Sequence, residues 1–120
     1  MMVRVVPAVA RSNIADAGLE QVAEVRAGDA MQTLAAIPAP IDLVLLDGWK
    51  DLYLPMLHLL RPKLRVGAAV FADNIFTFPT ELAPYVAFVR DPANGFESTT
   101  MPLGHGLEYS VLVRATAAHG

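Results

Sequence analysis

Cysteine is absent from this sequence of 120 residues. Its absence excludes a disulfide framework, a thiolate zinc site and a cysteine nucleophile, and it leaves the cytoplasm as the default compartment. Positive charge is also scarce, because nine Lys and Arg stand against twelve Asp and Glu, for a net charge of −3. A nucleic-acid backbone is bound by clustered basic residues, so nucleic acid is not an expected partner.

Long apolar runs are missing as well. The longest uncharged apolar-rich stretch, Val66 to Ala72, is far shorter than the ~20 residues that cross a bilayer. The first residues contain no long apolar segment that ends in a small-residue cleavage site, so no signal peptide is indicated. We therefore expect neither membrane insertion nor export.

The glycines are not arranged for cofactor binding. The one Gly-x-Gly motif, Gly104-His105-Gly106, is followed by no predicted helix that could present its amides to a phosphate. No Gly-x-Ser-x-Gly motif occurs, so a serine hydrolase has no support.

Apolar residues are abundant and make up 54% of the sequence. Four apolar runs are continuous rather than alternating, which predicts strands buried on both faces. These runs are Val3–Val6, Val22–Val25, Ile41–Leu46 and Val66–Phe71. Stretches between them are flanked by residues that cap or end helices. The expected helices are Ala8–Ala17, Ala30–Ala36 and Asp51–Leu60. This alternation predicts an α/β fold with a mostly parallel sheet.

The last third of the chain has a different pattern. A helix is expected from about Thr80 to Arg90. Two short strand candidates follow, Phe96–Met101 and Leu107–Val113, and the turn between them predicts an antiparallel hairpin. No linker or repeat interrupts the chain, so residues 1–120 are expected to form a single domain.

Polar residues follow the predicted strands where ligands of an open α/β sheet bind, outside the carboxyl ends. Asp47 directly follows one strand and Asp73-Asn74 directly follows the next. Two carboxylates and an amide carbonyl from adjacent strand tips suit a magnesium or calcium ion. The alternative is that Asp47 caps the next helix while Asp73-Asn74 forms a turn. A third polar cluster, Gly28-Asp29-Ala30, is expected at the same edge of the sheet.

Two residues close to Asp47 in the sequence, Trp49 and Lys50, are further candidates for the site at this edge of the sheet. Lys50 can accept a proton from a substrate hydroxyl close to a divalent cation, although a solvated surface lysine is the alternative. Trp49, the only tryptophan, can offer a flat apolar wall to an aromatic ring or a nucleobase, or it can pack beneath the loop. For Tyr53, on the helix that follows, packing or a satisfied surface position is the better interpretation.

The segments 42–55 (DLVLLDGWKDLYLP) and 66–74 (VGAAVFADN) closely resemble the cation-dependent O-methyltransferases that use S-adenosylmethionine, of the catechol O-methyltransferase type. The segments 13–19 and 26–30 are also similar to that family. The resemblance implies a Rossmann-like class I methyltransferase sheet and a phenolic or catechol-like substrate.

The same resemblance implies a role for each site residue. Asp47, Asp73 and Asn74 would hold Mg²⁺ or another divalent cation, and Lys50 would be the catalytic base. For S-adenosylmethionine, Trp49 would lie against the adenine, with Asp29 and Ala30 near its amine.

The chain differs from the family at its start. It begins at the family's second strand, without the first strand and its glycine-rich loop, and Val6-Pro7-Ala8-Val9 stands where an acidic ribose-binding residue is expected. We therefore expect the C-terminal portion of such a domain. The missing strand would lie between Val3–Val6 and Ile41–Leu46. Without it, these two strands either pair with each other, giving a six-stranded sheet, or keep apolar edges that have no partner. Unpartnered apolar edges predict a homo-oligomer or strand exchange. The alternative to an enzyme is a non-catalytic fragment that binds a divalent ion or a partner chain.

Overall fold

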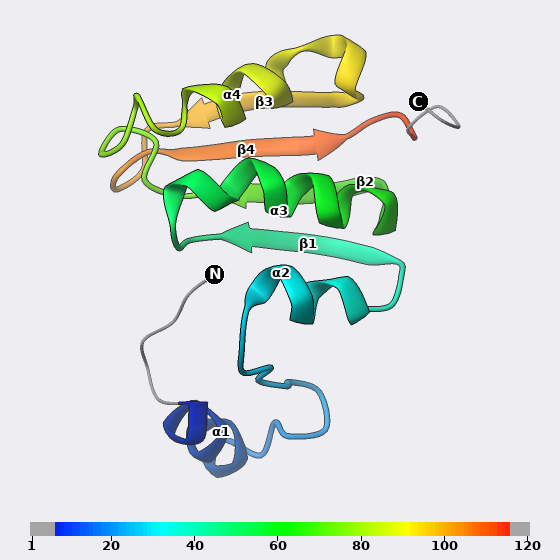
Figure 1. The fold of residues 1–120 in the computed structure, drawn as a ribbon, viewed down its shortest axis with the longest axis vertical. Coiled ribbons are helices and arrows are strands. Elements are labelled where there is room, and N and C mark those ends of the chain that lie inside the picture. The colour runs from blue at the N-terminus through cyan, green and yellow to red at the C-terminus, as the bar shows by residue number, and fades with distance from the viewer. Residues whose placement is uncertain (1–6, 116–120) are drawn as a thin grey trace.

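The computed structural model describes residues 7–115, which form a mixed sheet with helices on one face (Figure 1). The helices are α1 (Pro7–Asp16), α2 (Ala30–Thr33), α3 (Tyr53–Leu60) and α4 (Ala83–Arg90). The strands are β1 (Ile41–Leu46), β2 (Leu64–Ala72), β3 (Phe96–Met101) and β4 (Leu107–Leu112). Short 3-10 turns extend α2 through Leu34–Ala36, precede α3 at Lys50–Leu52, and follow α3 and α4.

The strand order is β1-β2-β4-β3, with β1 and β2 parallel and the other two pairs antiparallel. The α/β fold and its C-terminal antiparallel hairpin are therefore confirmed. Among the described residues the sheet has one parallel pair, so it is mixed rather than mostly parallel.

Two of the predicted strands are not among the four strands of residues 7–115. Val3–Val6 lies outside the described residues. Val22–Val25 was wrongly predicted as a strand, because it runs through a turn and irregular chain, with Val22 81% exposed. An isolated strand leaves its backbone N–H and C=O groups without partners. In residues 7–115, β1 pairs only with β2, so no neighbouring strand is there to satisfy those groups.

The first helical region is separate from the core. Helix α1 begins with Pro7, a favoured first helical residue, and the chain leaves it through Gly18 at φ +73°. Residues 8–29 contain no buried side chain, and Figure 1 shows α1 (blue) away from the sheet. None of the helices in the described part of the chain is long and apolar enough to cross a membrane.

The core lies between the sheet and helices α3 and α4. On α3 the buried residues are Tyr53, Met56, Leu57 and Leu60, a spacing that puts them on one face of the helix. They pack against alternate residues of the strands, including Leu46, Val70 and Leu112. The helices therefore cover one face of the sheet.

The opposite face is apolar, and no helix of residues 7–115 covers it. Pairing across the strands gives two rows on this face, Leu43–Ala69–Val111–Glu97 and Leu45–Phe71–Tyr109–Thr99. We call the apolar part of these rows the open face; it consists of Leu43, Leu45, Ala69, Phe71, Tyr109 and Val111. None of these six residues belongs to the core cluster formed by the described residues.

The prediction that β1 is buried on both faces is therefore wrong. Leu43 and Leu45 are 62% and 61% exposed. On the same face the rings of Phe71 and Tyr109 stack, with centroids 4.9 Å apart. β1 is an edge strand within the described residues, so one of its faces and its outer edge have no partner there.

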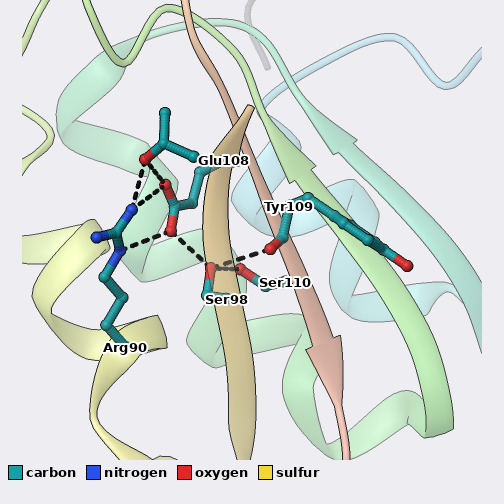
Figure 2. Close-up of polar contacts among 6 residues, drawn as sticks. Arg90, Ser98, Glu108, Tyr109 and Ser110 are labelled. Carbon is teal, nitrogen blue, oxygen red and sulfur yellow. Dashed lines mark hydrogen bonds and ion pairs between the residues drawn. The ribbon is translucent and has the colours of Figure 1, made fainter. Parts of the chain in front are cut away.

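A buried ionic cluster fastens α4 to the hairpin (Figure 2). The Glu108 carboxylate is fully buried and accepts hydrogen bonds from Arg90 Nε and Nη2 at 3.0 and 3.1 Å. The hydroxyls of Ser98 and Thr100 also donate to it. Burial alone would raise the pKa of Glu108, but the hydrogen bonds and the charge of Arg90 outweigh it and hold the pKa below its usual value.

Candidate active site

The register of the sheet places the predicted site residues at adjacent strand tips. Leu46, the last residue of β1, pairs with Ala72, the last residue of β2. Asp47 and Asp73 therefore leave two parallel strands side by side. The backbone supports this arrangement, because the amide of Asp73 donates to the carbonyl of Leu46 at 3.1 Å.

The side chains of Asp47 and Asn74 meet across this gap. Asn74 Nδ2 donates to Asp47 Oδ1 at 3.1 Å, although the two residues are 27 positions apart. Asp73 Oδ1 accepts from the Asn74 amide at 2.7 Å. Asn74 has a left-handed backbone with φ +73°, a conformation that asparagine tolerates better than most residues. The side chains of Asp47 and Asn74 are thus in contact, and the Asp73 carboxylate binds the backbone N–H of Asn74 beside them; we call these three residues the corner.

The charge of this corner is limited. The described residues contain no group of three or more His, Cys, Asp or Glu side chains that could hold a metal ion. The candidate donor set is therefore two carboxylates and one amide. Magnesium sites often use only one or two carboxylates and complete the shell with water and substrate oxygens, so this set fits such an ion.

Lys50 lies beside the corner in a defined position rather than free in solvent. Its Nζ donates to the Gly48 carbonyl at 2.7 Å and to the Tyr53 hydroxyl at 3.3 Å. The ammonium also lies 5.3 Å from the ring centroid of Tyr53 and 5.2 Å from that of Phe78, which are cation–π distances. These contacts restrict the Lys50 side chain to few rotamers.

The hairpin turn supports the corner from the other side. The amides of Ile75 and Phe76 donate to the carbonyls of Gly106 and His105, at 3.0 and 2.8 Å. Gly106 has φ +88°, and a Cβ at this position would lie 2.7 Å from the Phe76 ring. The hairpin turn therefore positions the chain that follows Asn74, and the close approach of Phe76 accounts for the glycine at 106.

The residues expected around a cofactor occupy different settings. Trp49 is 55% exposed, so it does not pack beneath the loop. Asp29 caps α2, because its Oδ1 accepts from the Met31 amide at 2.9 Å. Ala30 is partly buried against the core. Figure 1 shows that α2 begins on the side of the sheet where β1 ends, so Asp29 and Asp47 lie toward the same edge, as predicted. Among the described residues, however, no hydrogen bond joins Asp29 to Asp47.

Sequence reasoning missed two members of the site. Tyr53, for which packing or a satisfied surface position was expected, is fully buried, and its hydroxyl bridges Lys50 and the Asp73 carbonyl. Its position three residues after Lys50, one helical turn away, was a usable signal. Phe78 gave no such signal, because the turn at 75–82 alone brings its ring over Lys50.

The chain is an α/β domain whose candidate site lies at the carboxyl ends of β1 and β2, the edge where ligands of open α/β sheets bind. A family model described as a methyltransferase domain matches residues 4–75. That match spans more than half of the chain. The chain therefore belongs to this methyltransferase family.

Solved structures show the same fold at low sequence identity. An S-adenosylhomocysteine-bound methyltransferase from Podospora anserina superposes with a TM-score of 0.77 and 17% identity, over 89% of this chain and 56% of that one. An O-methyltransferase from Bacillus cereus, also in complex with S-adenosylhomocysteine, gives 0.74 and 22%, over 88% and 57%. The O-methyltransferase TomG from Streptomyces achromogenes, in complex with S-adenosylmethionine, gives 0.68 and 23%, over 88% and 56%.

This chain therefore spans a little over half the length of these structures. Nothing among the curated proteins matches its sequence.

Proposed function

We propose that this chain carries the metal-binding and proton-accepting part of an S-adenosylmethionine-dependent O-methyltransferase that acts on a phenolic or catechol-like hydroxyl. The contact between Asp47 and Asn74 at adjacent strand tips, with Lys50 held beside it, carries this proposal. Oxygen donors and a lysine at one corner suit the ionisation of a hydroxyl. The three neighbours described above, two of them named as O-methyltransferases, support methyl transfer as the reaction.

Asp47, Asp73 and Asn74 would hold a divalent cation, with Mg²⁺ as the first choice for oxygen donors. Asn74 now turns its amide nitrogen toward Asp47. A half-turn of the amide would present the carbonyl oxygen instead, and the two ends of an asparagine amide are nearly equal in shape. When bound, the cation would lower the pKa of a hydroxyl, and S-adenosylmethionine would supply the methyl group.

The remaining residues would bind and deprotonate. Lys50 would take the hydroxyl proton onto Nζ, while the electron pair of the broken O–H bond stays on the oxygen. Trp49 would lie against the adenine of the cofactor, since its ring is exposed at the correct edge. Asp29 and Ala30 would lie near the adenine amine. These residues would act chiefly by holding the reactants in line.

The metal site is tested by Mg²⁺ titration calorimetry on the wild type and the Asp47→Asn variant. The variant loses one carboxylate ligand, so we expect its binding heat to disappear. The control is Asp51→Asn, which makes the same charge change at an exposed residue of the same loop. Equal Mg²⁺ binding by all three proteins contradicts the proposed metal site, and loss of binding in both variants points to general electrostatics rather than ligation.

Catalysis is tested separately with S-adenosylmethionine, Mg²⁺ and a catechol. Methyl transfer by the wild type that is lost in Lys50→Met supports the proposal. No detectable binding of S-adenosylmethionine at millimolar concentration, with Mg²⁺ present, contradicts it for this chain.

A second candidate function is association without catalysis, and the open face favours it. Its apolar residues lie on β1, β2 and β4, whereas the one charged residue of the two rows, Glu97, is on β3, farthest from β1. Two copies can therefore stack through β1 and β2 and leave Glu97 at the margin, as sheets pack face to face ~10 Å apart. We propose a second copy of this chain as the partner.

Light scattering tests this association. We expect a dimer for the wild type and a monomer for the double variant Leu43→Thr, Leu45→Thr. The control is Leu103→Thr, because Leu103 is similarly exposed but lies in the hairpin turn. A monomeric wild type at micromolar concentration contradicts the proposal, and a dimer that survives the double variant excludes this face as the interface.

A further inference from the structure

Tyr53 has a hydroxyl group in a setting that packing does not explain. The residue is fully buried, and its ring meets the ring of Tyr85 edge-on at 5.9 Å. A phenylalanine would fill the same space. The hydroxyl instead makes two polar contacts, to the backbone of Asp73 at 3.1 Å and to the side chain of Lys50 at 3.3 Å.

The direction of these two hydrogen bonds is fixed by chemistry. The Asp73 group is a carbonyl, which can only accept, so the hydroxyl hydrogen of Tyr53 is committed to it. The oxygen lone pairs of Tyr53 are then left to accept from Lys50 Nζ. Tyr53 therefore links the position of Lys50 to the backbone of a proposed metal ligand.

Lys50 has a second acceptor of the same kind. Its Nζ donates to the Gly48 carbonyl at 2.7 Å, and the ring of Phe78 lies on another side of the nitrogen. Both oxygens accept, so a neutral Lys50 amine would use its two hydrogens on Gly48 and Tyr53. Its lone pair would then point in one remaining direction.

We infer that Tyr53 is a positioning residue that aims the Lys50 lone pair at the acceptor hydroxyl. This inference rests on the proposed function. In the step that it serves, the O–H bond of the hydroxyl breaks, its proton forms a third N–H bond on Lys50, and the electron pair stays on the oxygen. The bonds to Gly48 and Tyr53 persist throughout, so Lys50 does not have to move as it changes charge.

The sequence offers a clean spectroscopic test, because Lys50 and Lys63 are its only lysines. Lys63 is an internal reference, since its Nζ donates to the carbonyls of Ala35 and Ile37, both at 2.6 Å, far from Tyr53 in the chain. In ¹⁵N-lysine-labelled protein we expect two side-chain ammonium signals that exchange slowly with water. In Tyr53→Phe the hydrogens on Lys50 Nζ should exchange with water about tenfold faster, as expected for the loss of one hydrogen bond. The exchange rate of Lys63 should stay unchanged.

Two further variants separate orientation from burial. Tyr109→Phe removes a tyrosine hydroxyl on the other face of the sheet and should change neither lysine. Phe78→Leu removes a ring from Lys50 but keeps the Tyr53 hydroxyl, so the Lys50 signal should shift while its exchange rate stays within about twofold. An unchanged Lys50 in Tyr53→Phe overturns the inference. Equal acceleration in Phe78→Leu also overturns it, because burial alone would then hold the lysine.

A methylation assay adds the functional measurement. Tyr53→Phe should lower kcat about tenfold and leave KM for the acceptor unchanged. An unchanged kcat in an active enzyme refutes the positioning role. If the wild type transfers no methyl group, the proposed function fails, while the lysine signals still report whether Tyr53 holds Lys50.

Discussion

Replacement of Arg90 by methionine tests the buried cluster that ties α4 to the hairpin. Methionine keeps an unbranched chain of similar length but removes two charge-assisted hydrogen bonds to Glu108. Loss of one partner of a buried ion pair costs about 3–5 kcal/mol. The Arg90 side chain is 46% exposed, and Ser98 and Thr100 remain as donors. We therefore expect a smaller loss of about 2–3 kcal/mol at pH 7.

The loss should depend on pH, and its sign follows from the lowered pKa of Glu108. A group whose pKa is lower in the folded state stabilises the fold at pH values above its unfolded pKa, about 4.3 for glutamate. That stabilisation disappears as the pH falls through the folded pKa. The difference between wild type and Arg90→Met should therefore shrink as the pH is lowered from 7 to below about 4.

Urea unfolding at several pH values measures this difference. The matched control is Arg65→Met, because Arg65 pairs with Asp42 on the surface and both side chains are more than half exposed. That variant should lose less than about 1 kcal/mol at any pH. The reasoning is refuted if Arg90→Met loses no more than Arg65→Met, or if its deficit does not shrink as the pH falls below about 4.

Three smaller predictions concern the corner and its supports. Gly106→Ala should lower the free energy of unfolding by about 1–3 kcal/mol, because the added Cβ would clash with Phe76. Gly104→Ala has open space around the added Cβ and should lose only about 1 kcal/mol, and thermal unfolding measures both losses. Asn74→Gly should keep the stability of the chain but lose any thermal stabilisation by Mg²⁺. Asn74→Ala should lose that stabilisation and also about 1–2 kcal/mol of folding free energy, because alanine disfavours positive φ. Asp29→Asn should keep the helix cap, whereas Asp29→Ala should lower the free energy of unfolding by about 1 kcal/mol, as measured by urea unfolding. Equal losses in both variants would contradict the capping role.

The local signals of the sequence placed most elements of the sheet. Strand β1 has the predicted bounds Ile41–Leu46, and β3 has the predicted bounds Phe96–Met101. The start of α2 follows from Asp29, which caps it as expected. These elements depend on nearby residues, namely apolar runs and capping side chains, which can be identified without knowledge of the fold.

The candidate corner could be predicted because parallel strands end at the same edge of a sheet. Asp47 and Asn74 were selected as residues that directly follow strands, and their side chains meet at 3.1 Å. Their roles as ligands, like that of Lys50 as a base, stay predictions. For Tyr53 only packing or a satisfied surface position was predicted, because a sequence does not show which polar group a buried hydroxyl will reach.

The order of the amino acids is enough to show which segments are apolar, where helices can begin and end, and which polar residues follow the strands. Three features depended on the folded chain: within residues 7–115 Val22–Val25 has no strand beside it, Leu43 and Leu45 are on the open face, and Phe78 lies over Lys50. The reason is physical: strand pairing and burial depend on groups distant in the chain. Burial requires a second layer, and an apolar run in a sequence cannot show whether that layer is present.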